Sequence, residues 1–489
     1  MKRFLGFIIA IAVCLSTVFA VGCSCSSCGC GQDSNRSLYE IECELSGDTL
    51  ECTQQFTFYN NFENSVKQLK FNLFANAFRK DAKYSPILSQ HISLAYPNGI
   101  NYGEMTVKSV SQDGSALGFS IGGEDCNVLI VDLKEEVFPD ESVTINMAWT
   151  VKLADVVART GINADTINLA NFYPILCGYD NGFYECVYYG IGDPYFSDCA
   201  DYVVKVTADE NLVVAGGGKI TSESKNKGKK TTEFSLSNAR SFAMVLSSKF
   251  QTISANVGNT KITYYYYDDE SPDKSLNFAK TSMQLFNNTF GAYPYSTYSV
   301  VQTKFVQGGM EFPTITFISD NIEGTAYGEV IVHETAHQWW QTVVGNNEVE
   351  YGFLDEGLAE YSVVWYFENF PEHGYTRKSL INSAEQTYRV FCSVVDRLEG
   401  KVNTEMLRSL GEFSTEYEYV NIAYLKTCVM YDYLRTTIGD ENFFKGLKKY
   451  YSQYAFTNAG PYDIVGIYEK LGLGTNGFFE SFYSGKAII

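Results

Sequence analysis

The chain has 489 residues, and 45% of them are hydrophobic. One ordinary core does not accommodate that length, so we expect about three structural units. The net charge of -20 excludes nucleic acid as a natural partner, because its phosphates would be repelled. The 36 Tyr and 34 Phe favour β-strands and can also line a groove for an extended ligand.

The first 22 residues have the composition of an export signal. Met1-Lys2-Arg3 is basic, and the run that follows to Gly22 carries no charge. A run of this length could also span a membrane uncleaved. Phe19-Ala20-Val21-Gly22-Cys23 resembles the lipobox of bacterial lipoproteins, in which the cysteine becomes the lipid-bearing first residue. We therefore predict a signal peptide over residues 1–22 and a membrane anchor at Cys23, with the mature protein outside the cytoplasm.

Several cysteines follow in a Gly/Ser-rich tract over residues 23–35. A zinc module would need a second cluster of paired cysteines at a defined distance after this tract, and none follows. The tract is therefore predicted to be a flexible tether. Cys43 and Cys52 differ, because a two-residue turn at Gly47-Asp48 would set them opposite each other on paired strands. They would form either a cross-strand disulfide or two buried thiols.

Residues 36–250 are predicted to form an all-β domain. Apolar residues alternate in strand after strand, for example at Leu69, Phe71 and Leu73. Some glycines and lysines are interpreted as hairpin tips, because they lack the strand-to-helix frame of a phosphate-binding loop. These tips are Gly122-Gly123, Gly216-Gly217-Gly218 and the run from Lys225 to Lys230.

Residues 251–489 are predicted to form a second domain, with a small mixed sheet followed mostly by helices. One helix places Ala279, Met283, Phe286 and Phe290 on a single face. Beyond Phe353 helices dominate. The predicted strands are Lys261 to Tyr267, Tyr298 to Phe305 and Thr314 to Ile318, the last of them preceded by Gly308-Gly309-Met310-Glu311-Phe312.

His333-Glu334-Thr335-Ala336-His337 is an HExxH motif. Positions i and i+4 project from one face of a helix, so both imidazoles can bind a single ion with Glu334 beside it, although a buried histidine pair can also be mere packing. The apolar residues around the motif predict a buried helix that ends near Gly345. The other two histidines, His91 and His373, are interpreted as structural or exposed.

A catalytic zinc site needs three protein ligands and one open position. Glu356 is the best third ligand, because the eighteen residues between His337 and Glu356 allow one helix to end and another to return. Its carboxylate would then come from the first turn of that second helix. Asp355 and Glu360 are the competitors, and each could instead be an outer or surface acid.

These motifs together resemble the gluzincin aminopeptidases, the membrane alanyl aminopeptidase family. The spacing from the HExxH motif to Glu356 matches that family, and Gly308-Gly309-Met310-Glu311 resembles its Gly-x-Met-Glu-Asn loop. The resemblance covers most of the mature chain and implies an α+β multidomain fold. Its parts would be an all-β, saddle-like N-terminal domain and a thermolysin-like catalytic domain, without the C-terminal helical domain of larger relatives. A more open cleft that admits longer peptides is then expected.

The resemblance also implies a zinc-dependent aminopeptidase that acts on peptides. His333, His337 and Glu356 would bind one Zn²⁺, and Glu334 would serve as the general base. Glu311 would bind the free α-amine of the substrate by a charge-assisted contact. Gly308, Gly309 and Met310 would complete the substrate-binding loop.

The family's remaining features are less sharply marked. Tyr424 would stabilise the oxyanion, with Tyr417 and Tyr419 as rivals. Phe312 replaces the family's usual asparagine, and Asn171 is a candidate for the second amine anchor. These departures keep open a zinc endopeptidase of the same mechanism. A non-catalytic peptide-binding lipoprotein with this fold is the alternative from another functional class.

Overall fold

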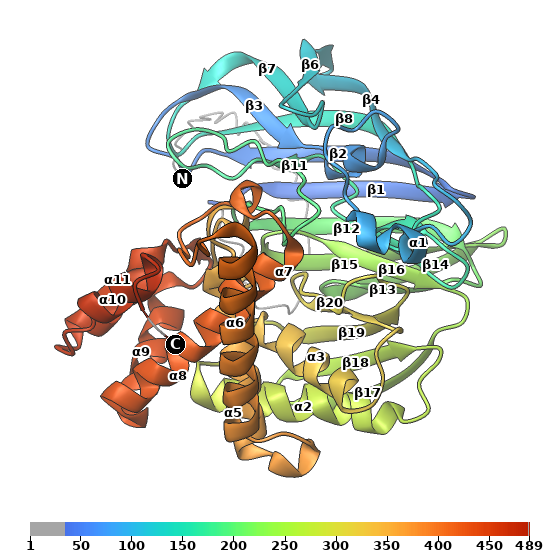
Figure 1. The fold of residues 1–489 in the computed structure, drawn as a ribbon. Helices are drawn as coiled ribbons and strands as arrows, with labels where there is room; N and C mark the ends of the chain where they lie inside the picture. Colours follow the sequence, from blue (N-terminus) through green and yellow to red (C-terminus); the bar gives the residue numbers. More distant parts are fainter. Residues whose placement is uncertain (1–34, 488) are drawn as a thin grey trace, which may run out of the picture. The chain divides into compact units, whose positions relative to one another are not determined.

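The computed structural model describes residues 35–487 and 489. The predicted signal peptide, Cys23 and nearly all of the tether lie outside these residues. The chain from Asn35 onward forms one compact unit, with a β-rich part up to Ser247 and a mixed part from Gln251 (Figure 1). A search of the described helices found none with the length and apolarity that a membrane span requires.

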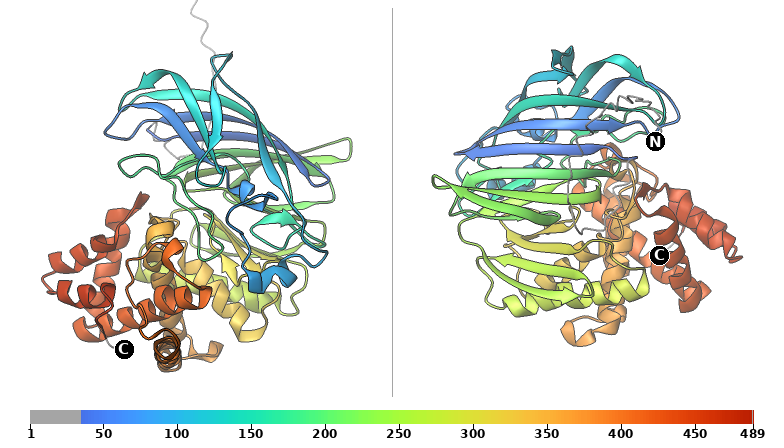
Figure 2. Two further views of the ribbon diagram at one scale, coloured as in Figure 1. Left: turned by 45° about the horizontal axis from the view of Figure 1, so that its top comes forward. Right: turned by 180° about the vertical axis from the view of Figure 1, so that it is seen from behind.

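The largest sheet of the β-rich part has eight strands in the order β14-β15-β12-β1-β2-β8-β4-β5. Only β1 and β12 pair in parallel within it. Alternate residues of β1 and β2 are buried, as the apolar alternation predicts. Figure 2 shows the long strands lying side by side. Their bounds are β1 Leu38–Ser46, β2 Thr49–Tyr59, β4 Glu104–Gln112, β5 Ser115–Ala116, β8 Ser142–Lys152, β12 Ala200–Asp209, β14 Lys219–Asn226 and β15 Lys229–Ala239.

Two four-stranded sheets complete the β-rich part, in the orders β13-β16-β10-β9 and β11-β3-β7-β6. Three short helical turns interrupt the strands, so this part is predominantly rather than entirely β. These elements are β3 Val66–Asn72, η1 Phe74–Phe78, η2 Ser89–His91, α1 Ile92–Ala95, β6 Phe119–Gly122, β7 Val128–Val137, β9 Thr160–Ile162, β10 Ile167–Ala170, β11 Ile175–Leu176, β13 Val213–Gly216 and β16 Ala243–Ser247.

The turn at Gly47-Asp48 joins β1 and β2 and places Cys43 directly opposite Cys52. The predicted register is therefore confirmed, and both side chains are buried free thiols in this structure. Lys225 to Lys230 spans the tip of the β14–β15 hairpin, also as predicted.

The interpretation of Gly216-Gly217-Gly218 as a hairpin tip is wrong. β13 and β14 on either side belong to different sheets, so the glycines carry the chain from one sheet to the other. The backbone N–H of Gly218 donates to Thr314 Oγ1 at 2.6 Å, and a side chain on Gly217 would meet the carbonyl of Pro313 at 3.0 Å. Close packing therefore requires these glycines, with Gly217 against the mixed part and Gly216 and Gly218 against Phe234 and Ser235 of β15.

The mixed part begins with a five-stranded sheet in the order β17-β18-β19-β21-β20. β18, β19 and β21 are parallel, with helix α2 as the crossover between the first two. The antiparallel edge strand β20 is only Gly309–Met310. The strand β17 was not predicted. The bounds are β17 Gln251–Val257, β18 Thr260–Tyr266, α2 Pro272–Thr289, β19 Thr297–Thr303 and β21 Ile315–Ser319.

Helices dominate the rest of the mixed part, and α8 to α11 gather on one side (Figure 1, red). A core rich in Tyr, Phe and Trp joins these helices to α2 and α3. The elements are α3 Gly324–Ala336, β22 Val344–Gly345, α4 Glu348–Tyr351, α5 Phe353–Asn369, η3 Pro371–His373, α6 Arg377–Glu399, η4 Leu410–Glu412, α7 Glu416–Tyr419, the π-helical η5 Val420–Lys426, α8 Thr427–Ile438, α9 Asp440–Tyr454, β23 Thr457–Asn458, α10 Pro461–Lys470 and α11 Asn476–Tyr483.

Candidate metal centre

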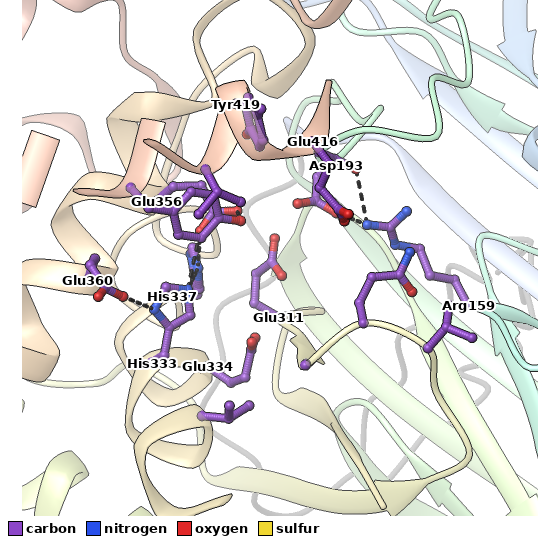
Figure 3. Close-up of a pocket in the computed structure, with 18 of the residues that line it drawn as sticks. Arg159, Asp193, Glu311, His333, Glu334, His337, Glu356, Glu360, Glu416 and Tyr419 are labelled. Atoms are coloured by element: carbon purple, nitrogen blue, oxygen red, sulfur yellow. Dashed lines mark hydrogen bonds and ion pairs between the residues drawn. The ribbon is translucent and has the colours of Figure 1, made fainter. Parts of the chain in front are cut away.

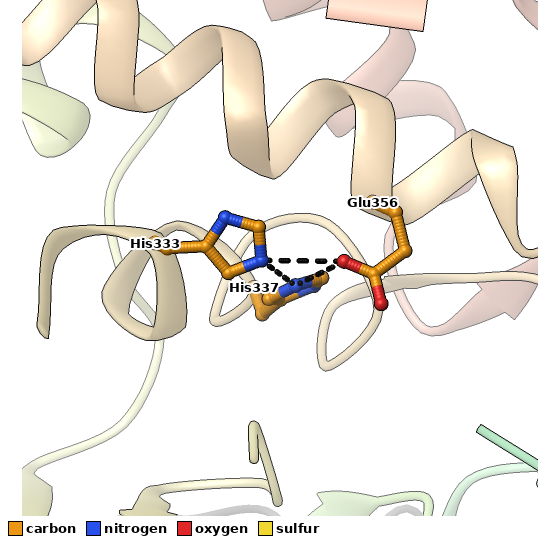
Figure 4. Close-up of side chains that lie close together, drawn as sticks. All are labelled: His333, His337 and Glu356. Carbon is orange, nitrogen blue, oxygen red and sulfur yellow. Dashed lines mark hydrogen bonds and ion pairs between the residues drawn. The ribbon is translucent and has the colours of Figure 1, made fainter. Parts of the chain in front are cut away.

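His333, His337 and Glu356 point toward one another from α3 and the first turn of α5 (Figure 4). The two Nε2 atoms are 3.0 Å apart, and each lies 3.2 Å from Glu356 Oε2. A tetrahedral zinc ion with bonds of about 2.0–2.1 Å would separate its ligands by about 3.3 Å. The three donor atoms therefore fit a single zinc ion without rearrangement of the backbone.

Further contacts orient each of the three ligands. His337 Nδ1 lies 3.0 Å from the carbonyl oxygen of Trp340, and His333 Nδ1 lies 3.2 Å from Glu360 Oε2. Both rings thus turn their Nε2 atoms toward the shared point, as metal-binding imidazoles require. The hydroxyl of Tyr424 donates a hydrogen bond to the other carboxylate oxygen of Glu356.

The helix that carries the histidines ends sooner than predicted. α3 stops at Ala336 with His337 as its cap, although the backbone N–H of His337 still reaches the carbonyl of His333. Gln341 has a φ of 116°, which no helix accommodates. Residues 338–345 are buried, so this segment has no exposed polar face. Without such a face the pattern of apolar residues could not show where the helix ends.

The structure distinguishes Glu356 and Tyr424 from their competitors. Asp355 is buried and accepts a hydrogen bond from Asn346 at 3.1 Å, whereas Glu360 contacts Nδ1 of His333, the ring nitrogen that faces away from the shared point. Tyr417 is exposed, while Tyr424 stacks on His333 with ring centroids 5.9 Å apart. Tyr424 lies in the π-helical segment η5, a backbone form often found at functional sites.

Glu334 lies beside the metal ligands and is almost completely buried. Its Oε2 atom has no hydrogen-bond partner, so it is available to a molecule in the cleft. Gly309 of the edge strand packs directly against it, since a Cβ there would fall 2.3 Å from Glu334 Oε1. The glycine of the loop motif is thus needed to make room for this carboxylate.

The loop 308–312 divides its residues between two sides. Gly308, Gly309 and Glu311 line the cleft with the metal ligands. Met310 instead faces the core, where its sulfur lies 3.1 Å from Arg159 Nε, so the structure does not bring it into the cleft. Phe312 is also buried and packs against Tyr195 and Phe317.

The cleft has a volume of about 470 Å³ and lies between residues of the β-rich part and the helices of the mixed part. Figure 3 shows Glu311 projecting between the metal ligands and the ion pair of Arg159 with Asp193. His91, interpreted from the sequence as structural or exposed, lies at the cleft and contacts Glu416 at 3.0 Å. His373 is structural, with Nδ1 2.6 Å from the hydroxyl of Tyr366.

Sequence reasoning missed Arg159 and Asp193. One feature of the sequence could have indicated Arg159. It is a single basic residue directly after the apolar run Val156-Val157-Ala158, in a chain with 57 acidic and 37 basic residues. A buried charge in such a run needs a partner. Asp193 supplies it from the turn at Gly192-Asp193-Pro194, and nothing in the spacing of the two segments reveals the pairing.

Acids and histidines shift one another's pKa in this site. Burial raises the pKa of Glu334 to about 8. The charge of His333 lowers this pKa and the charge of Glu311 raises it. Burial lowers the pKa of His337, but the charges of Glu311 and Glu356 raise it to about 10. Burial also opposes ionisation of Glu356, yet hydrogen bonds from both histidines hold its pKa below the ordinary value. Protons therefore compensate the acids where a cation would otherwise do so, and metal binding would release them.

Comparison with known proteins identifies this region. Residues 274–482 match the model of the peptidase family M1 domain. This part of the chain is similar to an M1 peptidase domain. The family resemblance inferred from the motifs is therefore confirmed, and the matched residues include His333, His337, Glu334, Glu356, Glu311 and Tyr424.

Solved structures extend the likeness beyond the M1 domain. The crystal structure of an M1 zinc metallopeptidase from Deinococcus radiodurans superposes on 93% of this chain and 95% of that chain, with a TM-score of 0.66 and 15% identity. A second structure from that organism, an E323A mutant bound to a Tyr-Ser-Ala substrate, gives a TM-score of 0.66 over the same shares. The two-part fold of this chain is thus the M1 metallopeptidase fold.

Curated relatives match part of the chain. The alanine/arginine aminopeptidase of Saccharomyces cerevisiae is 24% identical over 294 residues, which are 54% of this chain and 32% of that protein. The leukotriene A-4 hydrolase of Xenopus laevis is 24% identical over 205 residues, 39% of this chain and 30% of that protein. The chain thus spans about a third of the length of these relatives.

Proposed function

We propose that the protein is a zinc-dependent aminopeptidase that removes residues from the N-terminus of peptides. The position of Glu311 carries this proposal. Its buried carboxylate has an oxygen within 4.8 Å of ligand atoms of both His337 and Glu334, and Figure 3 shows it projecting into the cleft. A carboxylate there can bind the ammonium group of a peptide whose first carbonyl lies at the metal. The relatives named as aminopeptidases support the same activity.

Each role follows from the position of the residue. His333, His337 and Glu356 would hold the zinc ion, which when bound polarises a carbonyl and lowers the pKa of water. Glu334, with one oxygen unpartnered, would accept the proton of the attacking water and deliver it to the leaving amine. The hydroxyl of Tyr424 would donate a hydrogen bond to the developing oxyanion.

The Glu311→Gln variant tests recognition of the free amine. A neutral amide loses the charge-assisted hydrogen bond, a contribution of about 1.5–3 kcal/mol, so kcat/KM for a free aminoacyl anilide should fall by roughly 10- to 150-fold. Zinc content should stay unchanged. Steady-state kinetics with the anilide and metal analysis check both expectations.

The N-acetylated form of the same anilide serves as the control. Wild-type protein should cleave it far more slowly than the free form, and the Glu311→Gln change should leave that slow rate nearly unaltered. Equal wild-type rates on the two forms would instead favour the zinc endopeptidase, the alternative that the replacement of asparagine by Phe312 suggests. An absence of hydrolysis with and without chelator, across a panel of anilides and peptides, would favour the non-catalytic binding protein.

The Tyr424→Phe variant tests stabilisation of the oxyanion. Loss of one donor to such an oxygen typically reduces kcat by about 10²- to 10³-fold. The phenyl ring can still stack on His333, but the hydrogen bond to Glu356 is lost, so zinc affinity should fall by about 10- to 100-fold and kcat is compared at saturating zinc, where KM should change little. The matched control is Tyr417→Phe, since that tyrosine is exposed, and it should retain wild-type kcat. Equal activity of the two variants would remove Tyr424 from the mechanism.

We also propose that the protein is exported and tethered to a membrane through a lipid on Cys23. The basic start, the uncharged run and the lipobox-like segment support this proposal. Cys23→Ser should move the full-length protein from the membrane fraction to the soluble fraction and remove the mass of the acyl chains. Fractionation and mass spectrometry of the mature N-terminus check this, and an unchanged distribution would contradict it.

A further inference from the structure

A small chamber adjoins the cleft, and Glu311 lines both cavities. The free volume of the chamber is about 10 Å³, which is enough for one small ion or molecule. The residues around it include Asn171, Gln341 and Glu348, none of which belongs to the proposed zinc site.

Two acids of the chamber wall, Glu311 and Glu348, form a cluster with Asp355 behind them. Glu311, Glu348 and Asp355 each offer a carboxylate oxygen, and the three oxygens lie within 4.8 Å of one another. The exposed fractions of these residues are 4%, 2% and 3%. Glu348 and Asp355 belong to the consecutive helices α4 and α5, whereas Glu311 follows the distant strand β20, so tertiary packing brings Glu311 to the other two. Three carboxylates held this closely in a dry interior are unfavourable without a compensating cation.

Unpartnered oxygens provide a second, independent observation. Glu311 Oε1, Glu348 Oε1, Asn171 Oδ1 and Gln341 Oε1 are buried without a hydrogen-bond partner. All four residues are more than nine-tenths buried and line the chamber. Gln341 also has a φ of 116°, a strained value for a residue with a side chain, whereas the φ of 48° at Asn171 lies in the left-handed region that asparagine adopts readily. Strain at a residue that supplies an orphaned acceptor is typical of a ligand site.

The arginines close to the chamber are engaged by other groups. Arg240 lines the chamber, but its hydrogen bonds go to the carbonyls of Gln341, Ser197 and Thr457 and to the side chain of Asn458. Arg159 is paired with Asp193 in the cleft. Among the described residues, the amide of Asn346 is the one side-chain hydrogen-bond donor to the three acids, at 3.1 Å from Asp355.

We propose that the chamber is a second metal site that binds a hard divalent cation, calcium in preference to magnesium. Its donors are carboxylate and amide oxygens only, which suit Ca²⁺ and Mg²⁺ and disfavour softer metals. Magnesium retains several waters, for which a chamber of this size has no room, whereas calcium accepts a cage of protein oxygens. The adjacent zinc site differs in chemistry, because two of its three donors are imidazole nitrogens.

The test uses the full mature protein with its zinc in place. After dialysis against a calcium-selective chelator, added Ca²⁺ should bind at about one ion per chain beside the retained zinc, and Tm should rise with Ca²⁺ concentration. Elemental analysis and thermal unfolding measure both. Terbium, a luminescent calcium substitute, should bind competitively with Ca²⁺ and be sensitised by the ring of Tyr195 at the chamber wall.

Glu348→Gln is the decisive variant, since it removes one charge with little change of shape. It should weaken Ca²⁺ binding at least tenfold and abolish the rise in Tm at matched Ca²⁺. Glu350→Gln is the matched control on the same short helix, because Glu350 accepts a hydrogen bond from Tyr184 and does not line the chamber. It should bind Ca²⁺ as the wild type does.

Two results would overturn the inference. One is wild-type protein that binds no Ca²⁺ beyond background and shows no change in Tm, a result that requires no variant to fold. The other is a stabilisation that depends on Glu348 but is produced by a primary ammonium compound, such as an amino acid amide, and not by Ca²⁺. That result would assign the chamber to recognition of the substrate amine. None of these measurements depends on hydrolysis, so the proposed peptidase activity stands or falls separately.

Discussion

The Glu334→Gln variant is expected to lose about 10³-fold in kcat while it keeps its zinc. Glutamine has nearly the same shape and fits beside Gly309, but it cannot accept the proton of the attacking water. Because the role exists only in the transition state, kcat and kcat/KM should fall together and KM should change little. Steady-state kinetics on a free aminoacyl anilide, with metal analysis of the same sample, measure all three quantities.

Glu323→Gln is the matched control for this substitution. Glu323 lies at the N-terminal end of the same helix and is exposed, so its variant should keep wild-type kcat. Turnover of Glu334→Gln within twofold of the wild type would remove this residue from the base role. Glu311 has a carboxylate oxygen within 4.8 Å of one of Glu334, and its variant would then be examined for the missing function.

The second large effect is expected for Glu356→Ala. Two imidazoles whose Nε2 atoms are 3.0 Å apart would remain as the only zinc ligands, and Tyr424 would lose the acceptor of its hydrogen bond. Zinc content should fall from about one ion per chain to less than about 0.1 after dialysis against a chelator, with activity reduced by at least about 10³-fold. Tm should fall as well, because an ion bound only to the native state stabilises it.

Wild-type protein stripped by the same chelator is the control for Glu356→Ala. Added zinc should restore its activity, whereas the variant should stay inactive at the same zinc concentration. Glu360→Gln should give a smaller loss, about 10- to 100-fold in zinc affinity, because Glu360 only orients His333. If Glu356→Ala retained its zinc and its activity, the third ligand would have to be another acid, with Asp355 the nearest in sequence.

The zinc trio could be predicted from the sequence because its geometry depends on local periodicity. His333 and His337 are four residues apart, so they lie on one face of any helix that contains them. Glu356 follows at the start of the next long helix. The Cys43–Cys52 register was predictable for a similar reason, since a two-residue turn fixes every pair along its hairpin. In each case a short stretch of backbone decides which residues meet.

The remaining features depend on contacts between distant segments. Arg159 and Asp193 are paired from separate loops, and the carboxylates of Glu348 and Glu311 meet although their elements are far apart in the sequence. The end of α3 was misplaced because residues 338–345 are buried on all sides, so hydrophobicity there carries no period. Gly216-Gly217-Gly218 was misinterpreted because packing against Pro313 and Thr314 lies about a hundred residues away, far beyond any local signal.

The early end of α3 has a consequence for how the zinc site is formed. The carbonyl that orients His337 belongs to Trp340, which is bridged to Val344, and β22 at Val344–Gly345 pairs with β23 at Thr457–Asn458. Asn458 in turn contacts Arg240 of the β-rich part. The orientation of the second imidazole thus depends on a strand more than a hundred residues further along the chain. We therefore expect a polypeptide truncated before residue 457 to bind zinc more weakly than the full chain.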